Sequence, residues 1–214
     1  FSSDIHVAKE ELKPSALNGT LWVGIDNGLS PAAVLGQVDF NGRVLVYDSI
    51  FADGLGALRF CRERLKPLLA RKYPGFKVQL VADPACLQRS QADEKTIVDI
   101  YRAEGLQITT AKTNSIVARL ASVDYFLTRN IEGKSSILLC PVNSKPLIQA
   151  MRGKYRYRTN AKGETDNTPE KTHPHSDIAD ALQYLCLHAN AGSVYGATTN
   201  NVQKREVKKI QYAW

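Results

Sequence analysis

The sequence has few cysteines and no long apolar run, and each absence excludes a class of protein. Four cysteines occur among its 214 residues. They form no C-x-x-C pair and lie in or beside apolar stretches, so we expect reduced, buried thiols of an intracellular protein rather than a disulfide framework or a zinc site. No apolar run approaches the roughly 20 residues that a membrane-spanning helix needs, so we expect no integral membrane protein.

The composition is that of a folded, basic domain. Hydrophobic residues make up 43% and charged residues 23%, with a net charge of +7, which excludes extensive disorder, a coiled coil and a collagen-like fibre. The chain begins with Phe1 rather than Met and has no secretory signal, so we expect an excised or processed part of a longer protein. Turn and charge patterns predict an arm or linker over 1–19, a folded domain over 20–190 and a flexible basic tail over 191–214.

The spacing of apolar residues predicts an α/β fold. Short apolar runs predict strands at 21–26, 33–38 and 43–47, and the Asn41–Gly42 turn makes the last two antiparallel neighbours. Helical and strand patterns then alternate, with helices at 55–72, 93–104, 115–128 and 177–189, and strands at 77–82 and 106–110. Three antiparallel strands followed by this alternation predict a mixed sheet with helices on both faces.

Four aspartates fall where this order of elements would bring them together. Asp26 ends the first strand and Asp83 follows the fourth, so they would lie side by side if these strands are adjacent and parallel. Asp177 and Asp180 are three residues apart on one face of the last helix. Clustered carboxylates repel one another unless a cation neutralises them, and hard oxygen ligands suit Mg²⁺ or Mn²⁺. Two such ions about 4 Å apart can cleave a phosphodiester.

Each acid also has a simpler interpretation. Asp26 and Asp83 could be turn residues that accept hydrogen bonds from local amides. Asp177 follows Ser176, a good N-cap, and could stabilise the helix dipole, while Asp180 could face solvent. The order strand-Asp, strand-Asp, helix-Asp is more specific than any single member, so the nuclease interpretation depends on the whole set.

Three segments carry a resemblance to a known family. The segments GIDNG (24–28), VADP (81–84) and HSDIADAL (175–182) resemble the RNase H-like nuclease domain of phage terminase large subunits, most nearly those of headful-packaging, short-tailed phages. The last segment is also similar to the terminal helix of the Holliday-junction resolvase RuvC. The resemblance covers roughly residues 20–190 and implies an RNase H-like fold.

This resemblance implies an endonuclease that cuts concatemeric viral DNA during genome packaging with two Mg²⁺ or Mn²⁺ ions. Asp26, Asp83 and Asp177 would bind the metals, with Asp180 as a candidate fourth catalytic acid. Ser176 stands where many relatives have an acid, which leaves the choice between Asp177 and Asp180 open. Implied partners are double-stranded DNA, an ATPase domain earlier in the same polypeptide, the small terminase subunit, and a portal protein bound by the tail, all in the host cytoplasm.

A basic segment precedes the last helix. Its Arg and Lys alternate with Tyr155 and Tyr157, and an extended backbone would put the basic side chains on one face, which predicts a DNA-binding hairpin near 152–162. The alternative is a surface hairpin whose arginines are only solvated. In the family, a β-hairpin near this position contacts DNA or gates the site. The candidate DNA-binding residues are Arg152, Lys154, Arg156, Arg158 and Lys162.

Other signals leave some alternatives open. His173 and His175 could be loop residues or could assist proton transfer or DNA contact. The segment Gly133–Ser135 lacks the first glycine of a phosphate-binding loop, because position 128 is Thr. Two other functions remain: a junction resolvase or transposase-like nuclease of the same fold, and a non-catalytic module that binds DNA or the portal.

Overall fold

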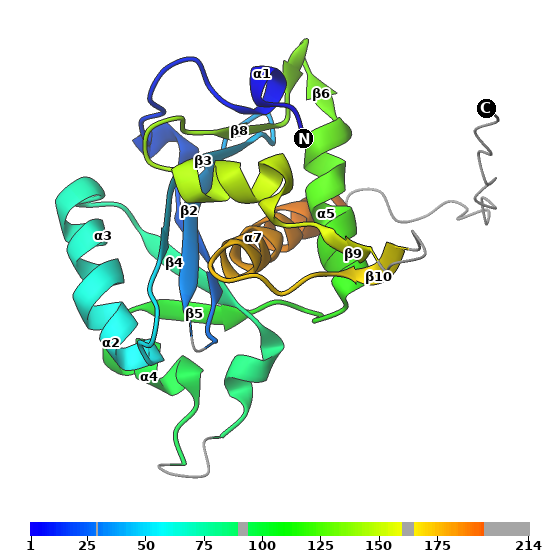
Figure 1. Ribbon diagram of the computed structural model, residues 1–214. Helices are drawn as coiled ribbons and strands as arrows, with labels where there is room; N and C mark the ends of the chain where they lie inside the picture. The colour runs from blue at the N-terminus through cyan, green and yellow to red at the C-terminus, as the bar shows by residue number, and fades with distance from the viewer. Residues whose placement is uncertain (29, 90–93, 160–164, 195–214) are drawn as a thin grey trace.

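A six-stranded mixed sheet forms the centre of the molecule, with helices on both faces (Figure 1). The computed structural model describes residues 1–28, 30–89, 94–159 and 165–194. The strand order is β5-β4-β1-β2-β3-β8. Strand β2 pairs antiparallel with β1 and with β3. Strand β4 pairs in parallel with β1 and with β5, and β8 pairs in parallel with β3. The strands are β1 (Leu21–Asp26), β2 (Ala32–Val38), β3 (Val44–Phe51), β4 (Val78–Ala82), β5 (Gln107–Thr110) and β8 (Ile137–Leu139). The predicted RNase H-like arrangement is confirmed.

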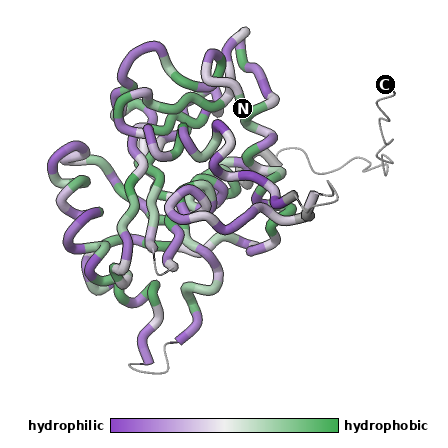
Figure 2. Tube along the Cα trace, viewed as in Figure 1, coloured by the Kyte–Doolittle hydropathy of each residue, from purple (hydrophilic) through white to green (hydrophobic). Residues whose placement is uncertain are grey.

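Two helical layers cover the sheet. One apolar core lies between the sheet and α2, α3 and α4, and a second lies between the opposite face and α5, α6 and α7. Figure 2 shows apolar segments concentrated along the strands of the sheet, between these layers. The helices are α2 (Ala57–Phe60), a π-helical turn (Cys61–Leu65), α3 (Lys66–Lys72), α4 (Ile97–Ala103), α5 (Ile116–Thr128), α6 (Lys145–Gln149), a second π-helical turn (Ala150–Lys154) and α7 (His175–Val194).

Helix α7 lies directly on strand β1 because glycine occupies the point of contact. A Cβ atom placed on Gly24 would be 2.1 Å from the carbonyl oxygen of Ala181 and 2.9 Å from Leu185 Cβ. Any larger side chain would therefore separate the helix from the strand. Gly24 lies two residues before Asp26, and Ala181 directly follows Asp180. The same close approach thus brings the first turns of α7 to the end of β1.

Several elements differ from the sequence prediction. Strand β8 and helix α6 were not predicted, because Ile137–Leu139 is too short to show a period. The predicted extended conformation is wrong for 152–154, which belong to the second π-helical turn, where Gly153 has a φ of 128°. The hairpin strands are β9 (Tyr157–Thr159) and β10 (Thr165–Pro169). Helix α7 continues to Val194, and the rest of the tail predicted over 191–214 lies outside the described residues.

The start of the chain packs on the domain. Helix α1 (Ser3–His6) carries a buried His6, whose Nε2 is 2.9 Å from the carbonyl oxygen of Leu127. Val7 forms a parallel bridge with Leu139 of β8. Further short elements are the 3₁₀ turns Ala16–Asn18 and Pro84–Leu87 and the strands β6 (Asn130–Ile131) and β7 (Lys134–Ser135).

Two predictions from composition have direct structural answers. All four cysteines are buried and unpaired, as expected: Cys61, Cys86, Cys140 and Cys186. Within the described residues, the structure contains no helix that is both long enough and apolar enough to cross a membrane.

Candidate functional site

Two of the predicted acids lie at the ends of neighbouring strands. Strands β1 and β4 pair in parallel with Ile25 opposite Ala82, so Asp26 and Asp83 leave the sheet at the same edge. Asp83 is the N-cap of the 3₁₀ turn that follows β4, and its Oδ1 accepts a hydrogen bond of 2.7 Å from the amide of Ala85. The turn interpretation of Asp83 is therefore correct, and it also fixes the orientation of this carboxylate.

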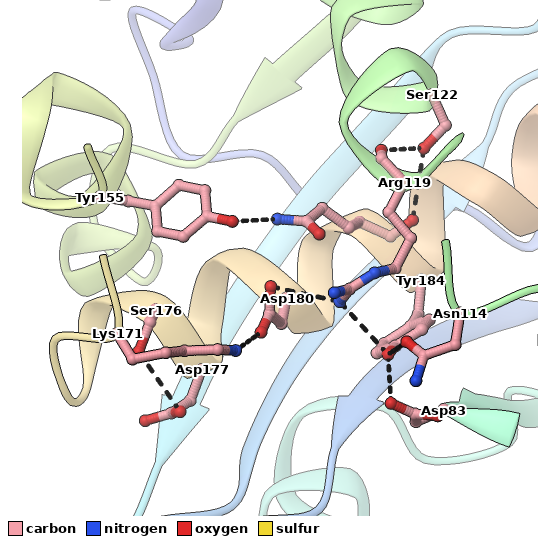
Figure 3. Close-up of polar contacts among 11 residues, drawn as sticks. Asp83, Asn114, Arg119, Ser122, Tyr155, Lys171, Ser176, Asp177, Asp180 and Tyr184 are labelled. Atoms are coloured by element: carbon pink, nitrogen blue, oxygen red, sulfur yellow. Dashed lines mark hydrogen bonds and ion pairs between the residues drawn. The ribbon is translucent and has the colours of Figure 1, made fainter. Parts of the chain in front are cut away.

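The other two acids come from the first turns of α7 and are almost completely buried. Asp177 contacts the more exposed His173, whose Nδ1 is 2.5 Å from Asp177 Oδ2. Asp180 Oδ2 accepts a hydrogen bond from the ammonium group of Lys171 (Figure 3). The expectation that Asp180 could face solvent is wrong, because only 3% of its side chain is exposed.

The four acids act on one another electrostatically, and the effect is clearest in the pKa of Asp26. Burial raises the pKa of Asp26 from 3.8 to about 7, and the negative charges of Asp180, Asp177 and Asp83 add to this effect. The ammonium group of Lys171 acts in the opposite direction. A carboxyl group with such a pKa is partly protonated near neutral pH. A cation that comes close to it would favour the charged carboxylate.

The donor set fits a divalent cation of the hard class. It consists of carboxylate oxygens from three elements that converge on one sheet edge, where burial and repulsion already raise the pKa of Asp26. Among the described residues, no three Asp, Glu, His or Cys side chains already surround a single point. Instead, Lys171 and His173 are placed against Asp180 and Asp177. The ammonium group of Lys171 thus neutralises part of the cluster in this structure.

Two residues that the sequence analysis did not single out join these acids. The Tyr184 hydroxyl donates a hydrogen bond of 2.6 Å to Asp83 Oδ2. Arg119 of α5 donates from Nη1 to the Tyr184 oxygen at 3.2 Å, and the same nitrogen is 3.3 Å from Asp180 Oδ1 (Figure 3). Burial, followed by the bond to Asp83, raises the pKa of Tyr184 well above its ordinary value, so its hydroxyl remains a donor.

The sequence holds only an ambiguous signal for Arg119. In helix 115–128 the apolar residues Leu120 and Leu127 are only half-buried and line an open groove of about 480 Å³. The buried face runs through Arg119, Ser122, Val123 and Phe126. A charged residue one position from an apolar stripe indicates either a solvated edge or a buried ion pair, and here it forms the ion pair with Asp180.

The predicted basic residues do not form a single group. The Arg152 Nε donates a hydrogen bond of 2.7 Å to Ser3 Oγ of the N-terminal helix. Arg156 and Arg158 extend from the hairpin, are 73% and 69% exposed, and lie 3.9 Å from Glu170. Lys154 is exposed in the π-helical turn, and Lys162 lies outside the described residues. His175 is half-buried, and its Nδ1 has no hydrogen-bond partner among the described residues.

Comparison with solved structures finds this fold in phage proteins of low sequence identity. The large terminase of a thermophilic bacteriophage, solved with ATP-gamma-S, matches with a TM-score of 0.62 and 19% identity, over 87% of this chain and 43% of that one. The large terminase (g2p) nuclease domain of bacteriophage SPP1, solved with bound Mn, matches with a TM-score of 0.55 and 16% identity, over 86% and 94% of the two chains.

The nuclease domain of the P22 large terminase gives a TM-score of 0.60 at 13% identity, over 88% of this chain and 89% of that one. No protein-family model and no curated protein sequence matches the chain. The chain spans less than half of the thermophilic phage's terminase but most of the two nuclease domains. The chain therefore has the fold of the nuclease domain of phage large terminases.

Proposed function

We propose that this chain is the nuclease domain of a phage terminase large subunit and that it cuts double-stranded DNA with divalent metal ions. The observation that carries the proposal is the convergence of Asp26, Asp83, Asp177 and Asp180 on one edge of an RNase H-like sheet. Support also comes from the SPP1 nuclease domain, which has this fold and was solved with bound Mn.

Asp26, Asp83 and Asp177 are proposed to hold the metal, and Asp180 to support them. Both Asp180 oxygens already face protein cations, Arg119 on one side and Lys171 on the other. Among the described residues, Asp177 pairs with the side chain of His173, which is largely exposed. Bound Mg²⁺ or Mn²⁺, in a pair, would activate water and stabilise charge on the scissile phosphate.

The wider role is part of the same proposal and is supported by the likeness in fold to phage large terminases. The substrate is proposed to be concatemeric viral DNA during genome packaging in the host cytoplasm. Arg156 and Arg158, exposed on the hairpin, would contact its phosphates without reading sequence. The proposed partners are an ATPase domain in the same polypeptide, the small terminase subunit and the portal protein.

The test is cleavage of supercoiled plasmid in Mg²⁺, in Mn²⁺ and in EDTA. The wild-type chain is compared with Asp26→Ala and with Asp53→Ala, a matched control on an exposed loop. We expect nicked and linear products that require metal, that disappear in Asp26→Ala and that persist in Asp53→Ala. Cleavage that survives in Asp26→Ala would contradict the proposed site.

Two further outcomes would change the assignment. A strong preference for four-way junctions over linear duplex would identify a resolvase-like enzyme of the same fold. Salt-sensitive DNA binding without metal binding or cleavage would identify a non-catalytic binding module instead.

A further inference from the structure

A buried chain of polar contacts connects helix α7 to the end of strand β4. It runs from Asp180 to the Arg119 guanidinium, from there to the Tyr184 hydroxyl, and on to the Asp83 carboxylate (Figure 3). It therefore joins two of the acids that lie on different elements. Arg119 comes from a third element, α5, which packs along α7.

The burial of Arg119 indicates more than a stabilising role. Its side chain is 9% exposed, that of Asp180 is 3% exposed, and its Nε has no hydrogen-bond partner among the described residues. A buried ion pair with an unsatisfied donor is a poor source of stability, because desolvation opposes the Coulomb attraction. An apolar pair of similar volume would pack this interface at least as well. The pair is thus better explained by what it does to its neighbours.

Both oxygens of Asp83 are oriented by donors of the chain. The Ala85 amide lies 2.7 Å from Oδ1 and the Tyr184 hydroxyl lies 2.6 Å from Oδ2. The Asn114 Oδ1 atom is 3.0 Å from the same hydroxyl, but one proton cannot serve both acceptors, and the charged carboxylate is closer. Arg119 Nη1 donates to the Tyr184 oxygen and its guanidinium lies 5.1 Å from the ring centroid. This contact strengthens the hydroxyl as a donor, because hydrogen bonds in a chain polarise one another.

We infer that Tyr184 and Arg119 are positioning residues, which hold the Asp83 carboxylate in the orientation that metal binding requires and tie it to Asp180 on α7. The inference rests on the proposed function. Neither residue needs to touch the metal or the DNA. Partners that orient metal ligands typically contribute about 10-fold to 100-fold in metal affinity, which sets the size of the expected effect.

The decisive variant is Tyr184→Phe, which removes one hydroxyl and keeps the ring in the core. Tyr47→Phe is its matched control, because Tyr47 is equally buried and donates a 2.9 Å hydrogen bond to Gln37, outside the acid cluster. The measurement is Mn²⁺ affinity of the 214-residue chain by calorimetry without DNA, together with the melting temperature in EDTA. We expect Tyr184→Phe to weaken Mn²⁺ binding about tenfold or more, with a loss of stability like that of Tyr47→Phe.

Arg119→Lys and Arg119→Met provide the second comparison. Lysine keeps the charge beside Asp180, so we expect Arg119→Lys to retain more Mn²⁺ affinity than Arg119→Met. If Arg119→Met does not fold, Arg119→Lys and Tyr184→Phe still decide the question. Tyr184→Phe with wild-type Mn²⁺ affinity would overturn the positioning role alone. A wild-type chain that neither binds Mn²⁺ nor cleaves DNA would overturn the proposed function, and the positioning role with it.

Discussion

Asp26 and Asp83 leave the sheet side by side, because Ile25 and Ala82 are register partners in adjacent parallel strands. Adjacent strands are only about 4.8 Å apart, so negative charges at this edge repel each other. Burial, together with the negative charges of Asp180, Asp177 and Asp83, raises the pKa of Asp26 from 3.8 to about 7. The cluster therefore opposes folding at neutral pH when no cation is bound.

The first prediction is that the metal-free domain loses stability as pH rises from about 4 to about 7. The folded protein keeps the Asp26 proton up to about pH 7, whereas the unfolded chain releases it near 3.8, so the free energy of unfolding falls across this range. Asp26→Asn removes the effect. Its melting temperature in EDTA at pH 7.5 should exceed that of the wild type by about 2–4 °C, the shift that about 1 kcal/mol produces at this size.

Bound metal should reverse the order of the melting temperatures of the wild type and Asp26→Asn. Mn²⁺ binds the folded state, so it should raise the melting temperature of the wild type and leave that of Asp26→Asn unchanged. Asp53→Asn, on an exposed loop, is the control and should follow the wild type in both conditions. A wild-type melting temperature that is higher at pH 7.5 than Asp26→Asn in EDTA would contradict the prediction.

The second prediction separates Asp177 from Asp180. Asp177→Asn should keep the fold and lose Mn²⁺ binding, because its partner His173 is largely exposed. Asp180→Asn should lower stability by about 3–5 kcal/mol, because it leaves the buried Arg119 guanidinium without a counter-charge. Thermal denaturation in EDTA and Mn²⁺ calorimetry distinguish the two effects.

The double variant Asp180→Asn with Arg119→Met supplies the internal control. Removing both charges should recover much of the stability that Asp180→Asn loses. If Asp180→Asn and Asp177→Asn have the same stability and the same Mn²⁺ affinity, the distinction between supporting and binding acid is wrong.

The sequence predicted the sheet edge well because its signals are local. The apolar runs around Ile25 and Val81 have strand length, and an Asp lies at or directly after each. The helix that carries Asp177 has a clear apolar face, so its existence was also predictable. The sequence could not predict that β1 and β4 are adjacent and parallel, since strand pairing and register are properties of the whole sheet. The structure gives it directly as Ile25 opposite Ala82.

The remaining site residues could not be found this way because their roles are long-range. Tyr184 and Arg119 are 65 positions apart, and each has an ordinary explanation within its own helix. Lys171 precedes α7 and no local pattern points it at Asp180. The contact between Gly24 and Ala181 was also invisible, since a glycine in a strand is as easily a bulge as a point of close packing.

The third prediction concerns that contact. Gly24→Ala should lower the melting temperature by about 2–12 °C, since the added Cβ would lie 2.1 Å from the Ala181 carbonyl oxygen and overpacking of this kind costs about 1–3 kcal/mol. The displacement of α7 should also weaken Mn²⁺ binding. Gly56→Ala is the matched control, because Gly56 has a φ of −70° and no atom within 4 Å of its added Cβ. Equal stability of the two variants would contradict the packing argument.

The fourth prediction concerns the hairpin. Arg156→Ala with Arg158→Ala should weaken duplex binding at every sequence and lower the slope of log affinity against log salt by about 2, if each arginine neutralises one phosphate. Both side chains are exposed, and their ion pairs with Glu170 are long, at 3.9 Å, so stability should not change. Arg59→Ala is the control, since Arg59 is exposed and ion-paired on α2.

Arg152 is expected to behave differently from the hairpin arginines. Its Nε donates to Ser3 Oγ at 2.7 Å, so it is partly engaged by the N-terminal helix. Arg152→Ala should therefore change the slope of log affinity against log salt by less than Arg156→Ala or Arg158→Ala does. Fluorescence anisotropy with a labelled duplex between about 50 and 200 mM salt, the range over which such contacts change affinity strongly, measures all three slopes. A larger loss for Arg152→Ala than for the double hairpin variant would locate the DNA on the face of α6 and α1 instead.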